Sequence, residues 1–128
     1  MERQSITFVN NDVICEGLLT RPRMNAQTPG IVICHPHPLR GGNMLNNVVV
    51  ALAEAFAADG FAVLQFNFRG VGSSTGHYAE GIGEQEDAKA ALLELIPAAI
   101  RNPCTYLSDL PYWAGWPCRT DDHDIWVS

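Results

Sequence analysis

The chain has 128 residues, enough for one domain with its own core, and 47% of them are hydrophobic, as in an ordinary globular protein. Its formal net charge is −6 and Lys89 is its single lysine, which argues against a surface that binds nucleic acid or an anionic membrane. No apolar run approaches the ~20 residues that span a bilayer, and the polar start lacks a signal pattern, so we expect a cytoplasmic protein.

The four cysteines, at positions 15, 34, 104 and 118, do not predict a disulfide framework in a reducing compartment. Cys104, Cys118 and His123 have a spacing that matches no zinc pattern, and no Cys-x-x-Cys is present. We therefore expect no metal and no cofactor.

The first twenty residues predict a β-hairpin. Residues 5–9 alternate between apolar and polar side chains, as a half-buried strand does. A turn signal follows at Asn10-Asn11-Asp12, and residues 13–20 resume the strand. A polar loop with two prolines then leads to residue 30.

The next segment predicts a parallel βαβ unit. Residues 31–34 and 61–66 are short, nearly continuous apolar runs, typical of strands that are buried on both faces. Between them we expect a helix from about residue 44 to Asp59-Gly60. Its apolar face is predicted to comprise Leu45, Val48, Val49, Leu52 and Phe56.

A second helix is predicted at residues 84–96, after a glycine-rich loop. Its apolar stripe comprises Ala88, Ala91, Leu92, Leu95 and Ile96, and acidic residues 84, 86 and 87 suit the positive end of the helix dipole. The composition changes after residue 101, where tryptophan, cysteine and proline gather. We therefore divide the chain into a domain at 1–101 and an irregular tail at 102–128.

Two loops carry a resemblance to a known family. The first reads His35-Pro-His-Pro-Leu-Arg-Gly-Gly-Asn43, and the second reads Phe66-Asn-Phe-Arg-Gly-Val-Gly-Ser-Ser74. Residues 5–96 resemble the N-terminal part of the α/β-hydrolase superfamily, and look most like the bacterial serine hydrolases near dienelactone hydrolase. The fold expected from this resemblance is a partial α/β-hydrolase fold of the α/β class. The function it implies is hydrolysis of a carboxylic ester or a similar acyl bond of a small molecule.

In this family the first loop supplies part of the oxyanion hole, which needs backbone N–H groups aimed at developing negative charge. Pro36 and Pro38 have no N–H, so His37 between them is the expected donor and Leu39 the second choice. An alternative interpretation is that His35 and His37 only shape a turn. A metal site at this pair would lack a third ligand.

In the second loop, Arg69, Gly70 and Gly72 have a structural role in the family. Related sequences often have aspartate where this chain has Asn67, which weakens the expectation of a charge pair to Arg69.

The family's nucleophile lies in Gly-x-Ser-x-Gly at a strand-to-helix turn. Ser74 matches the pattern within residues 72–76, but no helix is predicted to start there. After the second helix, Pro117 stands where the serine is expected, and proline cannot adopt the strained backbone of that position. We therefore expect no complete catalytic triad.

Three hypotheses follow for the function. The chain is ancestrally a serine hydrolase, expected to be truncated and inactive as it stands, with a tail that a frameshift would explain. The alternative is a non-catalytic α/β module, either a pseudo-enzyme or a partner that completes a sheet by self-association. A third hypothesis, phosphate binding at residues 69–74, lacks the lysine and helix that such a loop needs.

Overall fold

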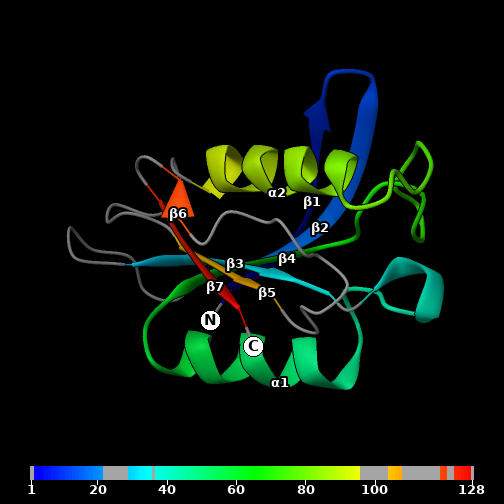
Figure 1. The fold of residues 1–128 in the computed structure, drawn as a ribbon. Helices are drawn as coiled ribbons and strands as arrows, with labels where there is room; N and C mark the ends of the chain where they lie inside the picture. The colour runs from blue at the N-terminus through cyan, green and yellow to red at the C-terminus, as the bar shows by residue number, and fades with distance from the viewer. Residues whose placement is uncertain are drawn as a thin grey trace.

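The computed structural model describes residues 2–21, 29–35, 37–95, 104–107, 119–120 and 123–127. The elements in this part of the chain are, in order, β1 (Glu2–Asn10), β2 (Val13–Arg21), β3 (Gly30–Cys34), the 3-10 turn η1 (Pro38–Arg40), α1 (Asn47–Ala58), β4 (Ala62–Phe66), α2 (Ile82–Leu95), β5 (Cys104–Leu107), β6 (Arg119–Thr120) and β7 (His123–Val127). The strands form one sheet in the order β1-β2-β4-β3-β5-β7-β6. Helix α1 covers one face of this sheet and helix α2 covers the other (Figure 1).

The predicted hairpin is confirmed: β1 and β2 pair antiparallel over their whole length. Asn11 occupies the turn with a φ of 54°, a left-handed conformation that asparagine tolerates better than most residues. The inner face of the hairpin contributes Phe8, Cys15 and Leu19 to the core beneath α2.

The predicted βαβ unit is also confirmed. Strands β3 and β4 pair in parallel register, with Val32 opposite Leu64, and α1 forms the connection between them. Every residue of both strands is buried, which explains why their sequences lack alternation.

Helix α1 buries only part of the predicted face, since Val49 is in the core and Leu52 and Phe56 pack against it. Its buried residues are Val49, Ala53 and Ala57, whereas Leu45 and Val48 are 64% and 51% exposed. The alanines let the helix lie close to the sheet, so the larger Leu52 and Phe56 pack at the margin of the contact. Leu45 precedes the helix altogether, because α1 begins at Asn47.

Helix α2 follows the prediction more closely. Ala88, Ala91, Leu92 and Leu95 are buried as expected, while residue 96 lies outside the described residues. Two acidic residues of its first turns, Glu84 and Asp87, are fully buried rather than solvated. Their partners lie in the loop that precedes the helix and, for Asp87, also at the end of β1.

The described part of residues 102–128, the segment predicted to be irregular, contains three short strands. Strand β5 pairs in parallel with β3, and β7 pairs in parallel with β5. The pairing is made with a strand some seventy residues earlier, at Ile31 opposite Cys104, so no local alternation was needed to define it. Residues 111–118, where the nucleophile position was sought, lie outside the described residues.

Candidate functional site

The candidate site lies where β3 and β4 end, at the carboxyl edge of the parallel strands. This is the edge at which open α/β sheets hold their ligands. The loop after β3 and the loop after β4 meet there, because the Met44 N–H donates to Asn67 Oδ1 at 2.8 Å. A second contact joins the same loops at the rings of His37 and Tyr78.

His35, the first residue after β3, ties the two loops together. Its side chain is fully buried, and Nε2 accepts the Phe68 N–H at 3.1 Å. The rings of His35 and Phe68 also meet edge-to-face, with centroids 4.8 Å apart. His35 therefore has a structural role, as the alternative interpretation held. Within the part of the chain that the structure describes, no group of three histidine, cysteine or acidic side chains could hold a metal ion.

His37 caps the turn that it begins. Its Nδ1 accepts the Leu39 N–H at 3.1 Å, Pro38 stands at the first position of η1, and Gly41 ends the turn in the left-handed region. The His37 carbonyl accepts the Gly42 N–H at 3.2 Å, which closes the loop behind the turn. Leu39, the second-choice oxyanion donor, thus already donates its N–H to the imidazole, and its side chain is 68% exposed.

Tyr78, in the loop before α2, faces the imidazole of His37. Its hydroxyl oxygen lies 3.2 Å from Nε2, and the ring centroids are 5.3 Å apart. Burial and the nearby carboxylates Glu84 and Glu80 raise the pKa of this phenol. Nothing in the local pattern around Tyr78 links it to the loop after β3, so the sequence alone does not indicate this residue.

Arg69 forms the charge pair that the sequence analysis did not expect. Its partner is Asp87 of α2, whose carboxylate accepts from Arg69 Nη2 at 2.8 Å and from the Arg69 backbone N–H at 3.0 Å. Asn10 also donates to Asp87, at 3.1 Å. The bonds to Asp87 raise the pKa of the guanidinium. The pair fixes the start of the loop to the helix, in keeping with the structural role expected for Arg69.

The side chain of Asn67 makes two hydrogen bonds that explain why asparagine stands here where related sequences often have aspartate. Its Nδ2 donates to Glu16 Oε2 at 2.9 Å, while Oδ1 accepts from Met44. An aspartate there would place a second carboxylate against Glu16 and could not donate to it. Glu16 of β2 also accepts the N–H of Ser73, so it holds the middle of the loop as well.

Gly70 and Gly72 both have positive φ, 77° and 56°. A Cβ on Gly72 would come within 2.7 Å of Asn67 Nδ2, and one on Gly70 would meet the backbone of residues 76–78. These glycines therefore allow a close approach of backbone to neighbours, the role that the resemblance implied for them.

Ser74 is held by the backbone on both sides. Its hydroxyl donates to the Asn67 carbonyl at 2.8 Å and accepts the Glu16 N–H at 3.0 Å, and its side chain is buried. The next helix begins at Ile82 and not at the serine. Among the described residues the hydroxyl has no base partner, and it does not lie in the strand-to-helix turn of a nucleophile elbow.

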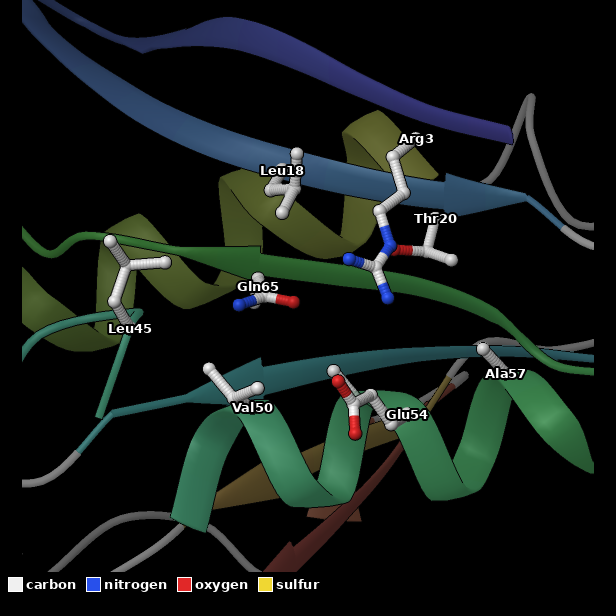
Figure 2. Close-up of a pocket in the computed structure, with 9 residues that line it drawn as sticks. Arg3, Leu18, Thr20, Leu45, Val50, Glu54, Ala57 and Gln65 are labelled. Carbon is white, nitrogen blue, oxygen red and sulfur yellow. The ribbon is translucent and has the colours of Figure 1, made fainter. Parts of the chain in front are cut away.

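Two hollows adjoin the loops. One, of about 590 Å³, opens between them and is lined by Pro38, Asn43, Leu45, Asn67, Val71 and neighbouring glycines. The other, of about 170 Å³, lies between the hairpin and α1, where Arg3 and Glu54 reach in from opposite walls (Figure 2). Only the first borders the His37 turn.

The buried thiols are poor nucleophile candidates. Burial, with a smaller contribution from Asp87, raises the pKa of Cys15 to about 12. Burial raises the pKa of Cys34 still more clearly. A thiol that stays protonated at neutral pH does not attack an acyl carbon.

Residues 17–93 match the family model of the X-Pro dipeptidyl-peptidase, S15 family, which covers more than half of the chain. The chain belongs to this family. Its members and the solved structures of similar fold are α/β serine hydrolases, which confirms the resemblance to the α/β-hydrolase superfamily. The narrower likeness to dienelactone hydrolase stays a prediction.

Solved relatives show how much of the fold this chain contains. An α/β serine hydrolase homologue from Coxiella burnetii is 38% identical, with a TM-score of 0.72 over 89% of this chain and 54% of its own. A lidless serine hydrolase of this fold from Xanthomonas campestris is 28% identical, with a TM-score of 0.76 over 84% of this chain and 50% of its own.

A curated relative is likewise much longer than this chain. The quorum-quenching protein AidA of Acinetobacter baumannii is 37% identical over 90 residues, which are 68% of this chain and 28% of AidA. The chain thus spans about a quarter of that curated relative and about half of the solved ones.

Proposed function

We propose that this chain supplies the oxyanion side of a serine hydrolase that acts on a carboxylic ester or a similar acyl bond of a small molecule. The single observation that carries the proposal is the rigid turn after β3. There His37 lies between two prolines, caps Leu39 with its own ring, and stands at the carboxyl edge of a family sheet.

An oxyanion hole needs donors that are fixed before the charge develops. The N–H of His37 is our first candidate, because prolines at positions 36 and 38 leave it as the only donor of that tripeptide. The Leu39 N–H is second, since it would have to leave the imidazole before it could serve an oxyanion. The hollow beside the turn offers space for a small acyl group.

The nucleophile, base and acid remain unassigned in the described residues. Ser74 is the formal match to the family motif, but both hydrogen bonds of its hydroxyl would have to break before it could attack. We therefore expect little hydrolysis by these 128 residues.

A serine-directed fluorophosphonate probe tests the proposal. The full chain is incubated with the probe beside its Ser74→Ala and Ser73→Ala variants, and the labelled peptide is mapped. Labelling at a serine outside the 67–75 loop, reduced when the His37 turn is altered, supports an oxyanion role. Labelling that vanishes only in Ser74→Ala would instead make Ser74 the nucleophile.

A second candidate is a non-catalytic module that associates through its sheet. Strand β1 stands at the end of the strand order, so its outer edge has no neighbour among the described strands. Such an edge can pair with a second copy. Sedimentation velocity over a range of concentrations tests this, and a monomer at every concentration argues against it.

We propose a cytoplasmic location. The free thiol of Cys15, buried in β2, supports a reducing compartment. In addition, the described helices include none that is long and apolar enough to cross a membrane.

A further inference from the structure

A chain of hydrogen bonds runs from the η1 turn through the His37 ring to Tyr78. The Leu39 N–H donates to Nδ1 at 3.1 Å, and the Tyr78 hydroxyl lies 3.2 Å from Nε2. A neutral imidazole carries one proton, so a ring whose Nδ1 accepts must carry it on Nε2. The Nε2–H then donates to the Tyr78 oxygen.

We propose that Tyr78 is a positioning residue for the loop after β3. By accepting from Nε2–H it holds the His37 ring in the tautomer whose Nδ1 caps Leu39, and so fixes the direction of the turn. The inference rests on the proposed oxyanion function of this loop and adds the group that keeps the loop ready. Tyr78 acts through His37 and needs no contact with the reacting atoms.

The backbone beside Tyr78 is itself firmly held. The next residue, Ala79, donates its N–H to Glu84 Oε2 at 3.0 Å, and Gly81 donates to Glu84 Oε1 at 3.1 Å. The Glu84 carboxylate is fully buried at the start of α2. The phenol is therefore presented from a fixed support.

The protonation state of Tyr78 agrees with this role. Burial and the charges of Glu84 and Glu80 raise its pKa, so the phenol stays neutral through physiological pH. A neutral phenol oxygen still accepts one hydrogen bond while its own proton remains for another acceptor. The turn after β3 is connected through His37 to Tyr78, and the backbone next to Tyr78 is bonded to Glu84 at the start of α2.

The tautomer of His37 is the primary test. Long-range proton–nitrogen correlation spectra of the uniformly 15N-labelled full chain distinguish Nδ1–H from Nε2–H rings. We expect His37 to be Nε2–H in its neutral form. A neutral ring protonated on Nδ1 would overturn the proposal, and this holds even if none of the variants below folds.

Variants then test the coupling to Leu39. In Tyr78→Phe we expect the Leu39 amide to exchange with water about three- to tenfold faster, the effect of weakening one hydrogen bond. His77→Gln is the matched control, because His77 is the exposed neighbour in the same loop, and it should leave the exchange rate unchanged. An unchanged rate in Tyr78→Phe, with the chain folded, contradicts the proposal.

His37→Asn tests the contact made by Nδ1 separately from the contact made by Nε2. The asparagine oxygen can replace Nδ1 as the cap of Leu39, but the side chain has no second nitrogen that reaches Tyr78. Adding Tyr78→Phe to His37→Asn should therefore cause no further acceleration. A full additional acceleration would show that Tyr78 acts by another route, and the proposal would fall.

These measurements need no catalytic activity, so their failure differs from failure of the proposed function. A chain with the expected tautomer and coupling but no probe labelling keeps the positioning role of Tyr78 and favours the non-catalytic module over the hydrolase. Labelling by the probe without coupling between Tyr78 and the Leu39 amide would support the hydrolase proposal and remove the positioning role of Tyr78.

Discussion

The carboxylate of Asp87 accepts hydrogen bonds from both the guanidinium and the backbone N–H of Arg69. The Asp87 side chain is fully buried and that of Arg69 is 17% exposed, so this ion pair is nearly removed from solvent. Because Arg69 follows β4 and Asp87 lies in α2, the pair fixes the loop that carries Ser74 and Tyr78 to the helix behind it.

We predict that Asp87→Asn destabilises the fold by about 2–4 kcal/mol, because it leaves the guanidinium without its charged partner in a buried position. Urea unfolding followed by circular dichroism measures the change. The matched control is Glu86→Gln, which removes the exposed pair with Lys89 at 3.4 Å and should cost less than about 0.5 kcal/mol. Equal effects in the two variants would mean that the buried pair contributes nothing special.

The strands of the hairpin and of the βαβ unit could be predicted because each has a recognisable pattern in its own local sequence. Alternation at residues 5–9 and apolar runs at 31–34 and 61–66 define strands that the structure contains. The face of α1 was predicted only in part, because Val48 and Val49 are equally apolar and only contact with the sheet distinguishes the buried Val49 from the exposed Val48. The strands after residue 101 depend on pairing with a distant neighbour.

The candidate site was predicted only where it depends on backbone chemistry. Two prolines around His37 indicate a rigid turn, and the glycines after Arg69 indicate a tight one. The side-chain partners were out of reach. The sequence indicates only a helix-dipole role for Asp87 and no role for Tyr78, because each meets its partner only after the strands and α2 have assembled.

We predict a large difference between two glycine substitutions of similar backbone conformation. Gly41 has a φ of 80°, and a Cβ added there would have nothing within 4 Å. Gly41→Ala should therefore cost only the conformational energy of the left-handed backbone, about 1 kcal/mol. Gly72→Ala adds contact with Asn67 and Glu16 and should cost about 2–4 kcal/mol. Chemical denaturation of both variants decides this, and equal costs would show that the loop relaxes freely.

We predict that Ser74 contributes to stability through its two backbone partners. Ser74→Ala leaves the Glu16 N–H and the Asn67 carbonyl without the hydroxyl and should cost about 1–3 kcal/mol. Ser73→Ala is the control: its side chain is exposed, and its N–H to Glu16 survives the change, so the expected cost is within about 0.5 kcal/mol. A neutral Ser74→Ala would argue that the hydroxyl is kept for another purpose.

We predict that stability falls as pH rises above 9, because of the buried thiols. The pKa of Cys15 is raised from 9.0 to about 12 in the folded chain, so between these values the unfolded chain loses a proton that the folded chain keeps. The unfolded state then binds fewer protons, and the free energy of unfolding decreases by about 1.4 kcal/mol per pH unit for each such group. Below pH 9 the two states hold the same proton and the thiol causes no slope.

Cysteine variants isolate this contribution from other groups that titrate in alkali. Cys15→Ala should flatten the decline between pH 9 and 11 by about 1.4 kcal/mol per unit, although burial of a smaller side chain lowers stability at every pH. Cys34→Ala should act the same way, since burial also raises the pKa of that thiol. A slope that stays the same in both variants would mean that these thiols ionise as readily in the folded chain as in the unfolded one, and that water reaches them behind β2 and β3.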